Sequence, residues 1–334
     1  MSTVTPPTIR PPRPAMDWHT PIAGDLVEVE RVLAEALSNP RPCIKRLMDH
    51  LESYRGKRLR PALLLLAARA CGHVTPAHHT LGAVVEMIHT ATLVHDDVLD
   101  AATVRRHQPT VNAAWGNQTS ILLGDYLFTH AYYLASTLGD PEACRLIGEA
   151  TNRVCEGELH QGTERGNLSL TETEYLDMVD GKTAALTACC CRLGALYSGA
   201  EPSVVESLTQ YGRLLGVAFQ IADDVLDLIG EERTTGKSLG TDVEQQKLTL
   251  PLIYVLRHSQ EGVRTSVHDI LVSSGNHKRE ALRPHLSKTG ALAYARGRAE
   301  EFAALARAEL DELAPCECRE ILMMLPHLVV HRSH

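Results

Sequence analysis

Residues 81–100 read LGAVVEMIHTATLVHDDVLD, and residues 214–227 read LLGVAFQIADDVLD. Both stretches are apolar on nearly every face of a helix until they reach a group of aspartates. A helix that is apolar on all sides is buried. The two stretches therefore predict two helices in the interior of the protein, and each helix carries carboxylates into that interior.

The remainder of the chain also favours helices over strands. Hydrophobic residues make up 44% of the 334 residues, whereas aromatic residues make up only 4%. Alanine and leucine have a high helix propensity, and strands prefer aromatic and β-branched residues. Because no convincing strand alternation appears, we expect an all-α fold of the bundle type. The expected helices span roughly residues 22–38, 41–54, 61–71, 76–103, 117–137, 141–165, 171–180, 182–198, 202–229, 243–258, 263–273, 277–287, 289–313 and 315–331.

The beginning of the chain has a different composition. Residues 5–14 read TPPTIRPPRP, and repeated prolines block both helix and sheet. We expect a disordered Pro-rich tail over residues 1–21, which could also serve as a ligand for a Pro-binding module. A single all-helical domain is expected over residues 22–334.

Charge and cysteine content exclude several classes of protein. The formal net charge is -8, so the chain lacks the basic surface of a nucleic-acid-binding protein. The nine cysteines form no CxxC pair, which gives a zinc site little support. No apolar run is long enough to span a bilayer, and no strongly basic amphipathic helix is evident, so we expect at most peripheral membrane contact. Free thiols in a reducing, cytoplasmic location fit this pattern.

Each of the two buried stretches ends in the pattern DDxxD. The six carboxylates belong to Asp96, Asp97, Asp100, Asp223, Asp224 and Asp227. On a helix each group of three lies within about one turn, roughly 5 Å of rise, so the like charges repel one another and burial strengthens the repulsion. A divalent cation removes this conflict, and Mg²⁺ typically binds carboxylate oxygens together with substrate phosphates. A single triplet would usually be a solvated helix face, but two copies on buried helices predict paired metal sites.

Basic residues form several separate groups that could bind phosphate. Residues 56–61 read GKRLRP and place Lys57 and Arg60 near a helix start at Pro61, where the helix dipole favours anions. The other candidates are His89, Arg105, Arg106, Lys182, Thr183, Lys237 and Lys247. Each has an ordinary alternative; His89, for example, could be a histidine of the core. Together with two acid groups for metal, these cations indicate an enzyme that binds two diphosphates.

At the level of whole motifs, the chain resembles the trans-isoprenyl diphosphate synthases, the polyprenyl synthetase family. The resemblance rests on GKRLRP (56–61), HTATLVHDDVLD (89–100), RRHQPTVNAAWGN (105–117), LLGDYLF (122–128), GKT (181–183), FQIADDVLD (219–227) and GKSLGTDVEQQKLTLPLIY (236–254). The motifs follow the family's order and spacing over the chain after the tail. The segment around the first DDxxD is most similar to long-chain members such as the octaprenyl diphosphate synthases.

The resemblance implies an antiparallel helical bundle around a deep central cavity, and a homodimer. It implies an enzyme that condenses isopentenyl diphosphate head-to-tail with an allylic diphosphate, using three Mg²⁺ ions, to give a long-chain trans-polyprenyl diphosphate. The implied metal ligands are Asp96, Asp100 and Asp223, supported directly or through water by Asp97, Asp224 and Asp227, and Lys182 joins these aspartates in the catalytic group. The implied isopentenyl diphosphate site contains Lys57, Arg60, His89 and Arg106. The implied allylic diphosphate site contains Arg105, Lys182, Thr183, Gln220, Lys237 and Lys247.

Three loops depart from the family pattern. Where the family commonly has RRG, residues 105–107 read RRH, and where it often has EGK, residues 244–247 read EQQK. A glycine pair before KRxRP is replaced by Arg-Gly at 55–56. These departures affect the expected loop geometry and leave the required charged groups in place.

Product length depends on side chains that lie deeper than the first acid group. Ala91 and Thr92 come about one turn before Asp96, where short-chain members of the family often have a bulky aromatic residue. Ala91 leaves this level open, Ile88 on the next turn is of modest size, and Tyr132 is the candidate floor. The residues therefore predict a long product, although Ala91 could also be an ordinary packing alanine.

Three other functions share some of these features. A short-chain synthase that makes farnesyl or geranylgeranyl diphosphate would have the same two acid groups. A class I terpene cyclase usually carries a different second motif, with Asn, Ser or Thr and Glu. A non-catalytic subunit of a prenyl synthase would be expected to lose acidic residues. Both DDxxD patterns are complete here, which favours an active, elongating enzyme.

Overall fold

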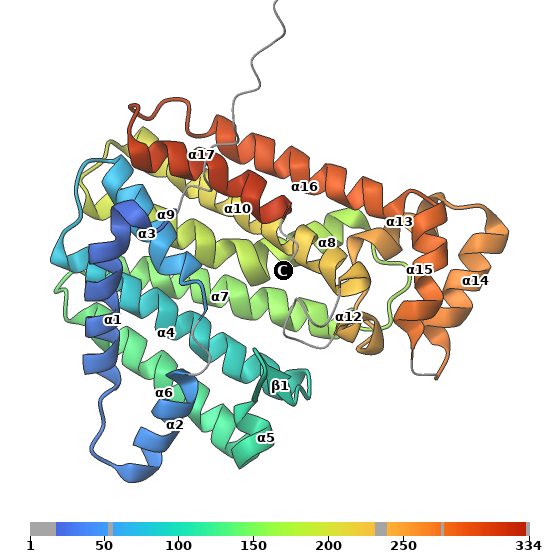
Figure 1. The fold of residues 1–334 in the computed structure, drawn as a ribbon, viewed down its shortest axis with the longest axis horizontal. Coiled ribbons are helices and arrows are strands. Elements are labelled where there is room, and N and C mark those ends of the chain that lie inside the picture. The colour runs from blue at the N-terminus through green and yellow to red at the C-terminus, as the bar shows by residue number, and fades with distance from the viewer. Residues whose placement is uncertain (1–17, 53–55, 231–238, 275–276, 332–334) are drawn as a thin grey trace, which may run out of the picture.

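The computed structural model describes residues 18–52, 56–230, 239–274 and 277–331, and helices dominate this part of the chain (Figure 1). The all-α prediction is confirmed. In chain order the elements are η1 (Thr20–Ile22), α1 (Ala23–Leu37), α2 (Pro42–Glu52), α3 (Leu59–Ala70), α4 (Pro76–Leu99), β1 (Val104–Arg105), β2 (Gln108–Pro109), α5 (Val111–Trp115), α6 (Asn117–Ser136), α7 (Pro141–Thr163), α8 (Glu172–Val179), η2 (Asp180–Ala184), α9 (Ala185–Tyr197), α10 (Pro202–Ile229), α12 (Thr241–Glu244), α13 (Leu250–His258), α14 (Glu261–Val272), α15 (Lys278–Lys288), α16 (Ala291–Ala308) and α17 (Glu317–Val330).

The predicted tail, residues 1–21, lies mostly outside the described residues. The last part of that range is described, and Thr20–Ile22 form a short 3₁₀ helix. The His19 ring nitrogen Nε2 lies 3.2 Å from the Lys57 carbonyl oxygen, so this segment contacts the loop before α3. No helix in the described ranges is long and apolar enough to span a bilayer.

The two long interior helices begin at prolines, as the sequence indicates. α4 starts with Pro76 and α10 with Pro202, and in each helix the proline occupies the first turn, where its missing N–H costs nothing. The described bounds of α10 match the predicted span. In Figure 1 both helices run from left to right, so their acid-bearing ends face the same side of the bundle, near β1 and α12.

The predicted helix over 76–103 ends earlier than expected, at Leu99. The backbone N–H of Ala102 donates to the Asp97 carbonyl (2.9 Å) and that of Ala101 to the Val98 carbonyl (3.2 Å). Ala101 has φ of 49°, and this left-handed conformation with two closing bonds is a Schellman ending. Glycine usually occupies this position, so the sequence does not signal the end.

A short hairpin follows this ending, although no strand is expected from the sequence. β1 pairs antiparallel with β2, with Arg105 opposite Gln108. The two connecting residues, Arg106 and His107, both have positive φ, 51° and 62°. Two-residue hairpin turns require this geometry and usually contain Asn-Gly or Asp-Gly. Arg-His carries no such signal, which is why the hairpin is missed.

The predicted helix over 243–258 is also wrong, because two helices occupy this region. α12 ends at Glu244 and α13 begins at Leu250. Gln246, between them, has φ of 59°, a left-handed conformation that no α-helix can contain. The family pattern EGK has glycine before its lysine, and in this chain Gln246 takes the left-handed conformation before Lys247.

The core consists of connected apolar clusters, and α10 takes part in the two larger ones. Its first half buries Leu208 and Leu215 in a cluster with α3, α4, α7, α9 and α17. Its second half buries Ile221 and Val225 in a cluster with α8, α13 and α14–α16. A smaller cluster joins α2, α4, α5 and α6. The acid-bearing end of α10 is therefore held by packing on several sides.

Candidate active site

The first acid group lies at the end of α4, and its three carboxylates have different surroundings. Asp97 is fully buried, and its Oδ1 accepts hydrogen bonds from Arg105 Nε (2.9 Å) and Nη2 (2.8 Å). Asp96 makes no hydrogen bond or ion pair with any described residue. Burial raises the pKa of Asp96 to about 6, although nearby Lys182 acts in the opposite direction.

Asp100 connects the end of α4 with the segment that follows α12. Its Oδ1 lies 2.9 Å from Lys247 Nζ and 3.6 Å from Arg165 Nη2. The Gln245 side-chain amide donates to the Asp100 carbonyl oxygen (3.0 Å). The structure thus brings together Asp100, a predicted metal ligand, and Lys247, a predicted allylic-site residue, which lie 147 residues apart in the sequence.

The second acid group lies near the end of α10. Asp224 is buried and accepts hydrogen bonds from the Tyr175 hydroxyl (2.6 Å) and from Gln220 Nε2 (2.8 Å). Burial, followed by the charge of Asp242, raises the pKa of Asp224 to about 8. The Gln220 side chain also accepts a hydrogen bond from the Thr183 hydroxyl (2.7 Å). Two predicted allylic-site residues are therefore linked to this acid group, Gln220 directly and Thr183 through Gln220.

Asp227 is buried and organises the chain beyond the second acid group. Its carboxylate accepts hydrogen bonds from the backbone N–H of Gly240 (3.1 Å) and of Asp242 (3.4 Å). The segment 239–247 is therefore fixed to Asp227 at one end and, through Lys247, to Asp100 at the other. This segment links the two acid groups.

The six carboxylates fall into two sets. The side chains of Asp97, Asp224 and Asp227 are buried, and each accepts hydrogen bonds from protein groups, although Asp97 Oδ2 has no hydrogen-bond partner among the described residues. Asp96, Asp100 and Asp223 are only half-buried. This division coincides with the sequence-based distinction between supporting aspartates and metal ligands.

The half-buried set fits a hard divalent cation. Asp96 is a carboxylate with raised pKa and no protein partner in the described chain, and oxygen ligands of this kind suit Mg²⁺. Within the described ranges, no three His, Cys, Asp or Glu side chains converge closely enough to hold a metal alone. Sites of this kind use one or two carboxylates and complete the coordination with water and substrate phosphate.

A cluster of arginines surrounds His89, about two turns before the first acid group. Burial lowers the pKa of His89 well below its usual value, and the charges of Arg60, Arg106 and Arg105 lower it further. His89 is therefore neutral at pH 7. Arg60 Nε is buried and has no hydrogen-bond partner among the described residues. Three residues predicted to bind isopentenyl diphosphate thus lie together, with an unsatisfied cation among them.

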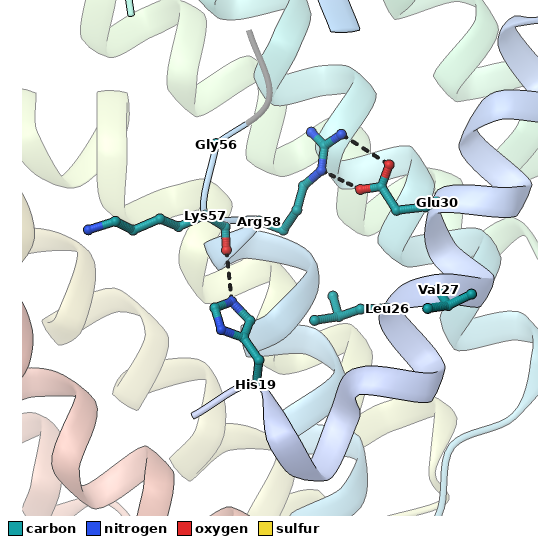
Figure 2. Close-up of a pocket in the computed structure, with 7 residues that line it drawn as sticks. All are labelled: His19, Leu26, Val27, Glu30, Gly56, Lys57 and Arg58. Carbon is teal, nitrogen blue, oxygen red and sulfur yellow. Dashed lines mark hydrogen bonds and ion pairs between the residues drawn. The ribbon is translucent and has the colours of Figure 1, made fainter. Parts of the chain in front are cut away.

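Arg58, in the same sequence motif, has a different role. It donates to Glu30 on α1 (2.5 Å) and to the buried Glu86 on α4 (2.6 Å). Figure 2 shows Arg58 directed toward Glu30, whereas Lys57 extends in the opposite direction. These residues line a hollow of about 380 Å³ beside α1. The two ion pairs hold the loop that carries Lys57, and the start of α3 that carries Arg60, against α1 and α4.

Lys182 and Thr183 occupy a π-helical turn, η2, between α8 and α9. Single π turns of this kind are frequently found at functional sites. Lys182 pairs with Glu158 and donates to Gln161 Oε1 (2.9 Å), both on α7. Burial alone would lower the pKa of Lys182, but Asp96 and Glu158 outweigh burial and raise it. Lys182 is therefore a buried cation next to the first acid group. Lys237, the remaining predicted allylic-site residue, lies outside the described residues.

Of the residues predicted to set product length, three precede the first acid group on α4, and Tyr132 lies on α6. Ile88 and Ala91 are fully buried, and Ala91 belongs to the small cluster with α2 and α6. The Thr92 hydroxyl donates to the His89 carbonyl oxygen of the same helix (2.8 Å). The Tyr132 hydroxyl is 2.5 Å from Thr151 Oγ1, a bond that joins α6 to α7.

Several residues of this site were not predicted from the sequence. The most prominent are Glu158, Gln161, Tyr175, Asp180 and Arg165. None belongs to a motif, and each meets its partner only through the packing of distant helices. For Glu158 the sequence offers one signal, an acid on the inner face of α7. Other acids give the same signal, so Glu158 could not be identified from the sequence.

Two carboxylate groups that suit Mg²⁺, with separate groups of cations around them, define a metal-dependent enzyme acting on diphosphates. The chain belongs to the polyprenyl synthetase family, whose model matches residues 41–288. It is 36% identical over 315 residues to octaprenyl diphosphate synthase of Escherichia coli (strain K12), covering 93% of this chain and 97% of that protein. It is 35% identical over 309 residues to a short chain isoprenyl diphosphate synthase of Methanothermobacter thermautotrophicus, covering 90% of this chain and 94% of that protein.

A solved structure agrees with the fold. The polyprenyl synthase from Caulobacter crescentus CB15, complexed with calcium and isoprenyl diphosphate, matches with a TM-score of 0.89 at 33% identity, covering 95% of this chain and 97% of that chain. The protein is therefore a trans-prenyltransferase that makes a polyprenyl diphosphate, in a family that uses a divalent metal. Because long- and short-chain relatives match at nearly the same identity, product length must be argued from side chains.

Proposed function

We propose that this enzyme condenses isopentenyl diphosphate head-to-tail with an allylic diphosphate to give a long-chain trans-polyprenyl diphosphate. The observation that carries the proposal is the small side chain of Ala91, about one turn before Asp96 on α4. No aromatic ring occupies that level of α4, and Ile88 on the next turn is aliphatic. Most of the matching curated relatives are hepta-, octa- or nonaprenyl diphosphate synthases, which supports the same reading.

The allylic diphosphate is proposed to lie between the two acid groups. Mg²⁺ ions, three per site with substrate bound, would be held by Asp96, Asp100 and Asp223 and would stabilise the negative charge of the departing diphosphate. Lys182 adds a fixed positive charge next to Asp96, which favours the same charge development. The allylic-site assignment also includes the polar and basic residues Arg105, Thr183, Gln220, Lys237 and Lys247.

Isopentenyl diphosphate is proposed to bind at the arginine cluster. Arg60 and Arg106 supply charge, Lys57 extends from the same loop, and the neutral imidazole of His89 can donate a hydrogen bond to a phosphate oxygen. The allylic C–O bond breaks, the isopentenyl double bond forms the new C–C bond, and the released diphosphate accepts the proton that leaves. The apolar surroundings of α4 and α10 exclude water, which would otherwise quench the allylic cation.

We also propose a cytoplasmic homodimer with at most peripheral membrane contact. Support for a dimer comes from α6, where Leu122 and Tyr133 are 60% and 67% exposed and Ile121 is exposed beside them. An exposed apolar helix face of this kind is typical of an interface. Sedimentation of the full chain tests the assignment, and a monomer at micromolar concentration would contradict it.

The proposed reaction is tested by incubating the purified chain with Mg²⁺, isopentenyl diphosphate and farnesyl diphosphate. Products are dephosphorylated and separated by chain length. Products of about seven to ten isoprene units are expected, and chelation of the metal with EDTA should abolish them. Products that stop at three or four units, also with dimethylallyl or geranyl primers, would contradict the long-chain proposal. Cyclic hydrocarbons or no product would favour a terpene cyclase or a subunit that needs a partner.

A further inference from the structure

Asp180 is a buried carboxylate at the start of the π-helical turn η2. Its Oδ2 accepts a hydrogen bond from Arg153 Nη2 on α7, and its Oδ1 accepts one from Arg213 Nε on α10. The Asp180 side chain is almost inaccessible, whereas both guanidinium groups are about half exposed. One buried acid therefore ties three elements of the fold together at the turn.

The same turn is packed too closely for any side chain on its neighbours. A Cβ on Gly157 of α7 would lie 2.5 Å from the Lys182 backbone nitrogen, and one on Gly181 would lie 2.9 Å from the Arg153 carbonyl oxygen. On the other side, a Cβ on Gly216 of α10 would lie 2.6 Å from Ala184 Cα. The turn is thus fixed between α7 and α10 by backbone contact, and Asp180 adds the polar bonds at its beginning.

The side chains of Lys182 and Thr183, which follow Asp180 in this turn, point to different helices. Lys182 reaches Glu158 and Gln161 on α7, and Thr183 reaches Gln220 on α10. An additional residue in a helical turn changes the direction of every side chain that follows it. The directions of Lys182 and Thr183 therefore depend on whether the π turn keeps its geometry.

We infer that Asp180 is a positioning residue for the allylic diphosphate: its bonds to Arg153 and Arg213 hold the π turn that aims Lys182 and Thr183 into the site. This inference rests on the proposed function of Lys182 and Thr183. Asp180 itself bonds to two arginines, and both of its carboxylate oxygens are occupied by these bonds. In Asp180→Asn one acceptor oxygen remains, but the other is replaced by an NH2 group that faces an arginine donor, so at least one of the two bonds is lost. The turn can then relax, which displaces Lys182 and Thr183 together.

The test compares Asp180→Asn with Asp177→Asn, the same chemical change three residues earlier on α8. The Asp177 side chain is 76% exposed, so its replacement controls for a change in net charge. Steady-state kinetics with Mg²⁺ give kcat and KM separately for farnesyl and isopentenyl diphosphate. A displacement of about 1 Å lowers kcat/KM by up to about 100-fold, so we expect Asp180→Asn to lose about 10- to 100-fold with farnesyl diphosphate. KM for isopentenyl diphosphate and the Asp177→Asn variant should stay within about twofold of the wild type.

A double variant separates positioning from general loss of structure. If Asp180 acts through Lys182, adding Asp180→Asn to Lys182→Ala should cause much less further loss than it does alone. Equal losses with both substrates, or a full additional loss in the double variant, would overturn the inference. If Asp180→Asn does not fold, Arg213→Gln removes one of the two bonds and should give a smaller effect of the same kind, and unchanged kinetics would overturn the inference.

The proposed function can fail separately from this inference. Wild-type protein that does not elongate farnesyl diphosphate contradicts the function. Calorimetric titration with a farnesyl thiodiphosphate and Mg²⁺ then still tests positioning. Binding weakened at least 10-fold by Asp180→Asn and not by Asp177→Asn supports the inference, and equal binding by all three proteins overturns it.

Discussion

Replacing Asp96 with asparagine should make the metal-free protein more stable while it destroys activity. In the described chain the Asp96 carboxylate has no hydrogen bond or ion pair, and burial raises its pKa from 3.8 to about 6. A shift of about two units corresponds to about 3 kcal/mol of penalty on the charged form. Because Asp96 keeps partial exposure, we expect Asp96→Asn to gain about 2 kcal/mol in free energy of unfolding at pH 7.5 in EDTA. Functional sites often contain groups that lower stability, so replacing such a group commonly raises the free energy of unfolding and lowers activity.

The pH dependence of this difference follows from the direction of the shift. The folded pKa is higher than the unfolded pKa, so the folded protein binds more protons between pH 4 and pH 6. Its stability therefore falls relative to Asp96→Asn as the pH rises through this range. The difference between the two proteins should be about a third of its full size near pH 4.5 and should be complete above pH 7.

Urea denaturation in EDTA at pH 4.5 and pH 7.5 measures both effects. Asp125→Asn is the matched control, because the Asp125 side chain is 61% exposed and its replacement should change stability little. Saturating Mg²⁺ with a diphosphate should stabilise the wild type more than Asp96→Asn, since only the wild type keeps this ligand. An Asp96→Asn protein that is less stable than the wild type at pH 7.5 without metal would refute the reasoning.

Three further predictions test other parts of the structure. Gly157→Ala should destabilise the protein by about 1–3 kcal/mol and lower its activity, because the new Cβ would lie 2.5 Å from the Lys182 backbone nitrogen. Gly162→Ala on the same helix is the control: its Cβ meets nothing within 4 Å, so it should stabilise the protein by about 0.5–1 kcal/mol. Thermal unfolding that shifts in the same direction for both would contradict the packing argument. His107→Gly should stabilise by about 0.5–1 kcal/mol by relieving the left-handed conformation at φ of 62°, and chemical denaturation that shows a loss would rule this out. Ala91→Tyr should shorten the product in the chromatographic assay, and an unchanged distribution would remove Ala91 from the account.

The sequence predicted best those elements whose signals are local. α10 was predicted over 202–229 and has those bounds, because a proline starts it and its apolar faces are unambiguous. The hairpin around Arg106 and His107 was missed because its geometry requires two positive φ values, which neither residue type predicts. The break at Gln246 was missed for the same reason.

The candidate site shows the same limit at the level of side chains. The two DDxxD patterns identify the acid groups, but the sequence alone does not show which carboxylates face protein partners. Asp97 meets Arg105 of the unpredicted strand β1, and Asp224 meets Tyr175 from a helix about fifty residues away. The family resemblance implies a division of the aspartates into two sets, but only the structure shows the contacts that accompany it.

Anomalous diffraction from a crystal containing Mn²⁺ and an unreactive farnesyl thiodiphosphate tests this division most directly. The account predicts metal peaks within about 2–2.5 Å of oxygens of Asp96, Asp100 and Asp223. The buried Asp97 and Asp224 should keep their bonds to Arg105 and Tyr175 and should contact no metal. Metal ions bound by Asp97 or Asp224, with Asp96 left without one, would contradict the central claim.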